Sequence, residues 1–328
     1  MMSFSNAIAT SLVSLLILSC ASNESKNTKI SGLVFGTSYN VVYNSPKNYK
    51  KEFDSIFKVL NTSLSTYLPN SDISKLNKKN QFVVDHHFVN VYNTAKKVYN
   101  TTNGVFDPTI GLLVNAWDFG PEKNIKRLNK PKIDSLMAYV GFNNVLLKHD
   151  TIFKPKDTYI DFNAIAKGYA VDVISNFLKA KHCNHHLVEI GGEIRTLGVN
   201  IEKEKPWRVG VEKPKFDGTQ SILKAITLTN AAMATSGTYR KFKIDRYGQR
   251  YAHIINTKTG YPSKTNLLSI SVITNNCMLA DAYATAFKAM GVKAVKKFLE
   301  SYPDIKVFLI YEENNSIKTL SLNGFPES

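Results

Sequence analysis

The sequence predicts an α+β fold, with a single large domain of mixed, mainly antiparallel sheet flanked by helices after an N-terminal lipoprotein signal peptide. Helix-like and strand-like stretches follow each other without the regular βαβ period of a doubly wound sheet. The chain has 328 residues, of which 43% are hydrophobic and 21% charged, enough to bury a large core. No linker rich in Pro, Gly or Ser divides residues 31–328, so we predict one domain there.

The chain begins with an uncharged run, MMSFSNAIATSLVSLLILSC. Its length and position are typical of a signal peptide rather than a membrane-spanning helix. The ending ILSC resembles a bacterial lipobox, which predicts a lipoprotein signal peptide over residues 1–19 and lipidation of Cys20. One departure from the pattern is that the run carries no Lys or Arg, and the alternative is a signal peptide cleaved without lipid attachment. Residues 20–30 are polar and predict a tether.

The net charge of +16 comes from scattered Lys residues, which favours a solvated surface over a nucleic-acid interface. We therefore predict no nucleic-acid partner, although the charge is compatible with an anionic ligand. The three cysteines form no CxxC pair, so neither a zinc site nor a disulfide framework is indicated. A single disulfide between Cys183 and Cys277 stays open.

In the first half of the domain, residues 31–44 alternate in polarity and contain Gly36, which indicates a strand pair or a bulged strand. Apolar residues at helical spacing, closed by Gly or Asn, predict the helices. In chain order we expect a helix over residues 53–60, a loop and short helical turn over 65–77, a helix over 88–99, a short helix over 131–140, and a hairpin of 145–147 with 152–154.

In the second half, a strand ending at Asp161 is expected to lead into a helix from about Ala164 to Leu178. The small residues Ala234–Gly237 predict a turn. Further strands are expected at residues 186–190, 207–212, 223–228, 250–255, 268–273 and 307–311, and further helices at 278–290 and 292–299.

The stretch DFNAIAKGYAVD, residues 161–172, has the outline of an anion and metal site. A helix start offers free N–H groups, and Lys167 adds a positive charge in its first turn. A free backbone carbonyl nearby could complete the shell of a metal ion. The alternative is an ordinary strand-to-helix turn with a surface Lys.

Asp281 and Thr285 are four residues apart in LADAYATAF and therefore share one face of the predicted helix. Carboxylate and hydroxyl oxygens suit Mg²⁺, which prefers oxygen ligands. Alternatively, Asp281 only favours the helix dipole, and Thr285 is packed.

Three further residues could contact a ligand, and each also has a purely structural interpretation. His253, before a Gly-containing turn, could accept a proton near neutral pH or be a structural His. Tyr67, on a probable loop, could stack on a flat heterocycle or pack on Pro69. Asp107 precedes a Pro that favours an extended backbone, which would leave its carboxylate free for a ligand, or it is a turn residue.

Together and in this order, a set of motifs resembles the family of FAD:protein FMN transferases: STYLPNSDISKLN, GVFDPTIGLLVNAWDFG, DFNAIAKGYAVD, VEIGGEIRTLG, ATSGTYR, HIINTKTGYP and ADAYATAF. The resemblance runs from about Gly36 to about Gly291. It implies Mg²⁺-dependent transfer of FMN from FAD to a Thr or Ser hydroxyl of an acceptor protein, through a phosphoester bond and with release of AMP. The alternatives are an FAD pyrophosphatase that releases FMN and AMP, and a non-catalytic flavin-binding lipoprotein.

The resemblance also implies roles for individual residues. The base would be His253, and the Mg²⁺ ligands would be the Ala164 carbonyl and the side chains of Asp281 and Thr285. Departures from the family pattern include Glu193 where Asp is common, and Asn256-Thr257 where Asp-Pro is common. The implied FAD contacts are Phe35, Tyr67, Val105, Phe106, Asp107, Asp161, Lys167, Ser236, Gly237 and Ile255.

For this chain the resemblance implies FAD as substrate and Mg²⁺ as cofactor. The implied acceptors are redox subunits of membrane electron-transport complexes, such as sodium-pumping NADH:quinone oxidoreductases. Many members of the family are lipoproteins, so the lipobox at Cys20 predicts a protein that is lipid-anchored on the periplasmic side of the bacterial inner membrane.

Overall fold

A computed structural model describes residues 27–122, 128–239, 242–244 and 250–327. Its centre is an eight-stranded sheet in the order β1-β2-β6-β7-β12-β15-β16-β17, in which all neighbouring strands are antiparallel. The α+β prediction is therefore confirmed. The strands are β1 Thr28–Val34, β2 Thr37–Tyr43, β6 His186–Ile190, β7 Glu193–Leu197, β12 Ala232–Gly237, β15 Leu267–Thr274, β16 Lys306–Glu313 and β17 Ser316–Leu322.

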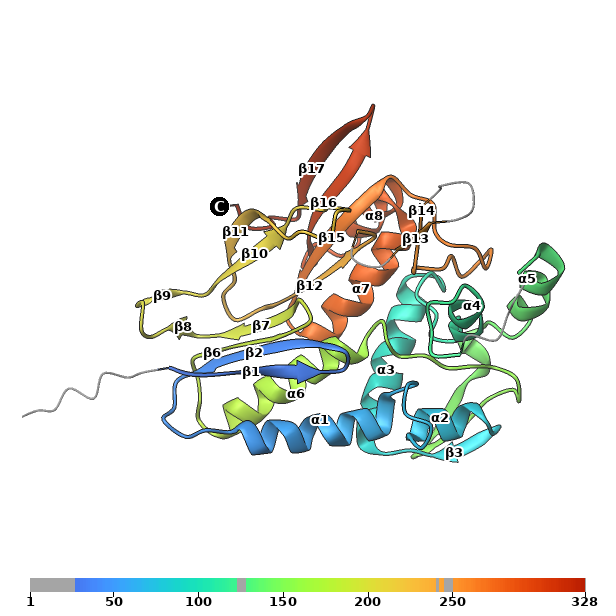
Figure 1. Cartoon of the computed structure of the whole chain (residues 1–328), viewed down its shortest axis with the longest axis horizontal. Helices are drawn as coiled ribbons and strands as arrows, with labels where there is room; N and C mark the ends of the chain where they lie inside the picture. The colour runs from blue at the N-terminus through green and yellow to red at the C-terminus, as the bar shows by residue number, and fades with distance from the viewer. Residues whose placement is uncertain (1–26, 123–127, 240–241, 245–249, 328) are drawn as a thin grey trace, which may run out of the picture.

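The helices gather on one face of this sheet. Figure 1 shows α1 and α6 below β1 and β2, α7 crossing toward β12 and β15, and α3 beside α7. Their bounds are α1 Lys50–Leu64, α2 Asp72–Asn77, α3 His86–Thr101, α4 Gly111–Ala116, α5 Lys130–Met137, α6 Ala166–Ala180, α7 Cys277–Met290 and α8 Val292–Leu299, with a 3₁₀ turn at Phe142–Asn144.

The main core lies between the sheet and these helices, where Tyr39, Phe53, Phe88, Phe162 and Phe287 are fully buried. The hydrophobic effect of this burial holds α6 and α7 against the sheet. A second cluster fills the other face, under the β10–β11 hairpin. The remaining strands are β3 Gln81–Val83, β4 Leu146–Lys148, β5 Thr151–Phe153, β8 Val199–Asn200, β9 Lys205–Pro206, β10 Arg208–Glu212, β11 Ile222–Thr227, β13 Phe242–Ile244 and β14 Arg250–Ala252.

Most of the predicted elements are present, including the opening strand pair and the two amphipathic helices α1 and α3. The turn predicted at Ala234–Gly237 is wrong, because these residues lie in β12. Small side chains there let α7 approach the sheet closely. The predictions did not include α4 or β17, whose first four residues are all exposed and so present no apolar face.

The strand predicted to end at Asp161 is also wrong. Tyr159 makes a single bridge to Ile110, and the following backbone bonds to side chains and loops instead of a neighbouring strand. The helix begins at Ala166, two residues later than expected, so Lys167 is its second residue. Likewise β14 ends at Ala252, so His253 follows the strand rather than lying in it.

Cys183 and Cys277 are both free and buried, so no disulfide joins them. Cys20 and the predicted signal peptide lie outside the described residues. The first strand begins at Thr28, so the last residues of the predicted tether belong to the sheet. In the described ranges, no helix has both the length and the apolar character needed to cross a bilayer.

His186 predicts an acid-sensitive step in stability. Its ring is fully buried, with Nε2 2.8 Å from Ser175 Oγ and Nδ1 2.7 Å from the Cys183 carbonyl oxygen. Burial lowers the pKa of His186 from 6.5 to about 4. Between these values the unfolded chain binds a proton that the folded protein does not, so stability falls as the pH drops.

We expect His186 to reduce the free energy of unfolding by roughly 3 kcal/mol between pH 6.5 and pH 4. Urea unfolding at several pH values gives the free energy of unfolding of the wild type and of His186→Gln as a function of pH. The contribution of His186 is the difference between the two slopes of this free energy against pH. His149→Gln, at an exposed position, is the matched control and should keep the wild-type slope. Equal slopes for the wild type and His186→Gln would contradict the prediction.

Candidate active site

Helices α6 and α7 cross in close contact near their N-termini, and Gly168 makes that contact possible. A Cβ on Gly168 would lie 2.3 Å from the carbonyl oxygen of Cys277 and 2.8 Å from Cβ of Asp281. Both distances are shorter than any normal contact, so a larger residue would push the helices apart. The sequence stretch that outlined an anion site thus lies directly against the helix that carries the predicted metal ligands.

The two helices cap each other at this crossing. The backbone N–H of Gly168, in the first turn of α6, donates to Asp281 Oδ2 of α7 at 3.0 Å. In return, Asp172 of α6 accepts hydrogen bonds from the first two N–H groups of α7. Each buried carboxylate therefore satisfies helix N–H groups that would otherwise lack a partner.

Strand β7 adds one charge of each sign to this centre. Glu193 and Arg195 are two residues apart and so point to the same face of the strand. Lys167 Nζ lies 2.5 Å from Glu193 Oε1, and Arg195 Nη1 lies 2.7 Å from Asp172 Oδ1. The two ion pairs connect α6 to the sheet.

The directions of the pKa shifts show which of these groups interact. Burial raises the pKa of Glu193, with Lys167 opposing and Asp281 adding to the rise. Burial alone would lower the pKa of Lys167, but the carboxylates of Asp281 and Glu193 outweigh it and raise this pKa. Lys167 therefore stays charged, and its ammonium faces two carboxyl groups.

The predicted metal ligands are placed around the same crossing. Asp281 is buried on α7, and Thr285 lies one turn further on, with its hydroxyl 3.4 Å from that of Ser236 on β12. Ala164 lies in the turn that leads into α6. The described residues contain no group of three or more His, Cys, Asp or Glu that could hold a metal ion.

This donor set fits Mg²⁺ rather than a transition metal. A carboxylate, a hydroxyl and a backbone carbonyl are hard oxygen ligands, and Mg²⁺ completes its shell with water or phosphate oxygens. Oδ2 of Asp281 accepts a hydrogen bond from the N–H of Gly168, whereas no hydrogen bond to its Oδ1 is found within the described residues. Buried Oε2 of Glu193 likewise has no hydrogen-bond partner in the described part of the chain. Both atoms suit a bound cation or its water.

The loop that carries Tyr67 is tied to the stretch before α6. Asn77 donates to the carbonyl of Ile160 at 2.9 Å and accepts from its N–H at 2.8 Å. The side chain of Asn163 also donates to the hydroxyl of Thr66. Tyr67 is 55% exposed, and partial burial together with the nearby charge of Asp161 raises its pKa. The structure therefore places Tyr67 and Asp161 near each other, and their contact with FAD stays a prediction.

The segment Val105–Asp107 is close to Asp161 as well, because Asp161 N–H donates to the carbonyl of Pro108 at 2.8 Å. The carboxylate of Asp107, however, is not free as expected. It is buried and accepts from the N–H and hydroxyl of Thr109 and from the N–H of Phe142. Asp107 thus holds its own turn, and a ligand contact by this segment through backbone or neighbouring groups stays a prediction.

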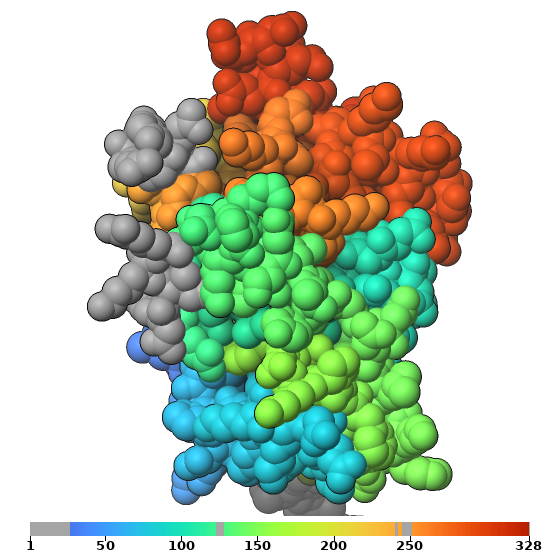
Figure 2. Space-filling model, turned by 90° about the vertical axis from the view of Figure 1, so that its right-hand side faces the viewer, coloured from blue at the N-terminus to red at the C-terminus, as the bar shows by residue number. Residues whose placement is uncertain are grey.

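The loop after His253 lies against the same segment. The hydroxyl of Thr257 donates to the carbonyl of Gly104 at 2.6 Å, directly before Val105. The ring of His253 packs edge-on against Phe119, with centroids 6.2 Å apart. Figure 2 shows the green region around α4 and α5 between the light-blue region of α1 and α2 and the orange region after β14. Ile255 is buried with the residues of α4 and α5.

Phe35 occupies a strained position at the tip of the β1–β2 hairpin. Its φ is +51°, and that of Gly36 is +74°, as a two-residue turn of this hand requires. Few bulky residues adopt this conformation, and here the ring of Phe35 packs edge-on against Phe57, with centroids 5.7 Å apart. The turn leads to Thr37, whose side chain would be 2.9 Å from a Cβ on Gly191, next to Glu193. The hairpin tip therefore adjoins the charged centre.

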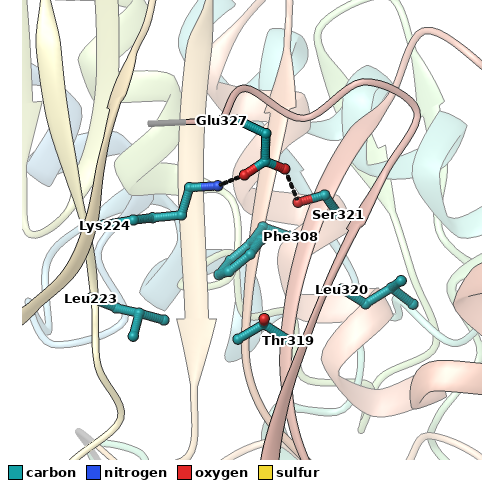
Figure 3. Close-up of a pocket in the computed structure, with 7 residues that line it drawn as sticks. All are labelled: Leu223, Lys224, Phe308, Thr319, Leu320, Ser321 and Glu327. Atoms are coloured by element: carbon teal, nitrogen blue, oxygen red, sulfur yellow. Dashed lines mark hydrogen bonds and ion pairs between the residues drawn. The ribbon is translucent and has the colours of Figure 1, made fainter.

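The structure also contains two open pockets that none of the predicted residues lines. Figure 3 shows one of about 400 Å³ between β11 and the β16–β17 hairpin. Its Lys224 is already paired with Glu327 at 2.6 Å and lies 4.8 Å from the ring centre of Phe308. The other, of about 510 Å³, is lined mainly by uncharged residues near β3 and β4. No residue placed where α6 and α7 cross lines either pocket.

Sequence reasoning missed the partners of Lys167 and the helix-capping role of Asp172. A partial signal for them existed, because Glu193 and Arg195 are two residues apart and carry opposite charges, although no strand was predicted there. Lys167 and Asp172, also of opposite charge, are five residues apart on the predicted helix. Which charge pairs with which depends on the helix lying across the strand, and only the structure provides that.

Comparisons with known proteins identify the family to which this chain is similar. A model of the ApbE family matches residues 35–309. The FAD:protein FMN transferase of Haemophilus influenzae is 34% identical, with 94% of each chain covered, and that of Vibrio cholerae is 32% identical, with 96% of each chain covered.

Solved structures are similar over the same length. The flavin transferase ApbE from Vibrio cholerae has a TM-score of 0.82 and 32% identity, covering 90% of this chain and 97% of that one. The apo form of the flavinyl transferase ApbE from Pseudomonas stutzeri has a TM-score of 0.81 and 28% identity, covering 90% and 95%.

The close crossing of the helices predicts that Gly168→Ala is destabilising. In an open helix, Gly to Ala would stabilise by about 1 kcal/mol. Here the clash with Cys277 and Asp281 should reverse the sign and cost about 1–3 kcal/mol, measured by urea unfolding. Lys179→Ala, an exposed position on the same helix, should change stability by less than about 0.5 kcal/mol. A Gly168→Ala variant that is more stable than the wild type would contradict this packing.

Proposed function

The chain belongs to the ApbE family, and we infer that it is an FAD:protein FMN transferase whose active site lies where α6 and α7 cross. The observation that carries this assignment is the convergence of Lys167, Asp281 and Thr285 at that crossing, in a chain 34% identical to a transferase over 94% of its length. The proposed reaction moves FMN to a Thr or Ser hydroxyl of an acceptor protein.

FAD contains FMN and AMP joined by a pyrophosphate. The hydroxyl oxygen of the acceptor attacks the phosphorus of the FMN half and forms a new P–O bond. The bond from this phosphorus to the bridging oxygen breaks, and AMP leaves with that oxygen. The hydroxyl proton passes to His253, acting as general base. Catalysis of such phosphoryl transfer depends mainly on positioning and on neutralising charge.

Residues of α6 and α7 would hold the pyrophosphate. The ammonium of Lys167 and the N-terminal end of α6 attract phosphate oxygens. Glu193 fixes Lys167 in place through their 2.5 Å contact. Ser236 and Gly237, on β12 beside Thr285, would adjoin the same oxygens. The ligands of Mg²⁺ would be Asp281, Thr285 and the Ala164 carbonyl, and bound Mg²⁺ would stabilise negative charge on the phosphate.

Aromatic groups near the loop ends would bind the flavin ring. The half-exposed Tyr67 can stack on a flat heterocycle. Phe35 and the segment Val105–Asp107 would line the same half of the site, with Asp161 between that segment and Tyr67. The loop with His253 and Ile255 would close the side from which the acceptor approaches.

We further propose that Cys20 is lipidated and that the protein is anchored on the periplasmic side of the inner membrane. The lipobox at residues 17–20 supports this proposal. The described domain begins within a few residues of Cys20, with β1 at Thr28, so the active site would stay near the bilayer. The acceptors would be redox subunits of membrane electron-transport complexes, which are reached from the same surface.

The metal-ligand role predicts that Asp281→Asn loses transfer activity. Asn keeps the shape and can still accept from Gly168, but it is a much weaker Mg²⁺ ligand. We expect the rate of FMN transfer to fall at least about 100-fold and the Mg²⁺ requirement to rise. The readout is the mass gain of the acceptor by FMN minus water. Asp304→Asn, at an exposed position, is the control and should transfer normally.

Three outcomes of this assay distinguish the functions. Labelled acceptor supports the transferase. FAD cleaved to FMN and AMP while the acceptor stays unlabelled would instead establish a pyrophosphatase. FAD that binds and stays intact would establish a non-catalytic flavin-binding protein.

The base role predicts that His253→Gln lowers the rate constant of transfer by about 10²–10⁴-fold, because no group then takes the hydroxyl proton. Affinity for FAD should stay within about twofold, since the ring is not needed to hold the substrate. Stopped-flow transfer rates and FAD titrations measure the two effects separately. His86→Gln, an exposed His on α3, is the control. A His253→Gln variant with the wild-type transfer rate would exclude His253 as the base.

A further inference from the structure

We propose that Asp172 is a positioning residue for the metal site, which acts by fixing the first turn of α7 so that Asp281 and Thr285 meet the cation in the correct orientation. This inference rests on the proposed function, since it concerns the same site. Asp172 itself is not placed as a ligand or as a group that contacts FAD. Its effect on the reaction would pass entirely through α7.

The carboxylate of Asp172 holds α7 with both oxygens. Oδ1 accepts from the N–H of Cys277 and Oδ2 from the N–H of Met278, both at 2.9 Å. Side chain and backbone of Asn276 accept from the next two N–H groups, at Leu279 and Ala280. All four N–H groups at the start of α7 are therefore satisfied, two of them by a residue more than a hundred positions earlier in the chain.

Asp172 is itself held firmly. It is 6% exposed, and Arg195 Nη1 donates to its Oδ1 at 2.7 Å from β7. A buried carboxylate with three strong hydrogen bonds has little freedom to move. Asp172 thus transmits the position of the sheet to the end of α7. Replacing the carboxylate by an amide removes the charge that pairs with Arg195 and leaves at least one N–H of α7 without its acceptor.

The effect should reach the metal ligands because they are so close. Asp281 lies one turn after Cys277, and it is bound back to α6 through Gly168. The N-terminus of α7 is therefore fixed to α6 at two points on successive turns. If the first is lost, the Gly168 contact is the remaining hydrogen bond from α6 that orients Asp281 among the described residues. Residues that orient metal ligands typically change metal affinity 10–100-fold when they are replaced.

The test compares Asp172→Asn with the wild type by Mg²⁺ calorimetry in the presence of FAD. Asn has the same shape but only one accepting oxygen. We expect the dissociation constant of Mg²⁺ to rise about 10-fold or more, and saturating Mg²⁺ to restore most of the transfer rate. Rescue by metal separates a positioning residue from a base or a substrate contact, neither of which Mg²⁺ could replace.

The matched control is Asp85→Asn. Asp85 caps α3 by accepting from the N–H of Phe88 at 2.8 Å, so the chemical change is the same on a helix without proposed ligands. It should lower the melting temperature and leave Mg²⁺ affinity within about twofold. A folded Asp172→Asn variant with wild-type Mg²⁺ affinity would overturn the inference, as would an equal loss of affinity in Asp85→Asn.

If Asp172→Asn does not fold, Arg195→Gln provides the second test. It removes the ion pair from the strand side and leaves Asp172 with both N–H groups of α7. We expect Mg²⁺ affinity to fall at least about threefold, and an unchanged affinity would count against the inference. Failure of the proposed function is distinguishable, because the wild type itself would then transfer no FMN and bind no Mg²⁺ with FAD.

Discussion

The candidate site depends on one contact, the crossing of α6 and α7 at Gly168. Because this residue has no side chain, the backbone of α6 reaches Asp281, and each helix then provides a carboxylate for the other's free N–H groups. Two helices that cap each other cannot slide or rotate independently. The crossing therefore fixes Lys167 relative to Asp281, although the two residues are more than a hundred positions apart.

Strand β7 turns this crossing into a defined charge pattern. Its Glu193 and Arg195 each pair with the opposite charge on α6, so a shift of the helix by one residue would separate both pairs. Buried ion pairs contribute little net stability, because the cost of removing charges from water offsets their attraction. Their effect here is specificity of register, which keeps the ammonium of Lys167 in one place beside the carboxylates.

Local spacing was sufficient to predict part of the site. Asp281 and Thr285 share a helix face in any tertiary arrangement, and the helix predicted to carry both is present as α7, while their role as metal ligands stays a prediction. Contacts between distant segments could not be predicted in the same way. Asp107 was expected to be free, but Thr109 fills its Oδ1 locally, and its Oδ2 accepts from Phe142, which lies 35 residues later. The small residues of Ala234–Gly237 suggested a turn. They are small because α7 packs against them, and α7 comes much later in the chain.

The charges at the crossing also explain why FAD and a cation should bind together. Lys167 provides one positive charge against the carboxyl groups of Asp281 and Glu193. An added pyrophosphate would meet a centre that is not positive, and its own charge would oppose binding. A divalent cation held by Asp281, as proposed above, would reverse this balance, and phosphate oxygens would suit it as further ligands. By thermodynamic linkage each must raise the affinity for the other to the same degree. The charges of the site alone would therefore favour joint binding of FAD and the cation, without any specific contact with the flavin or the adenine.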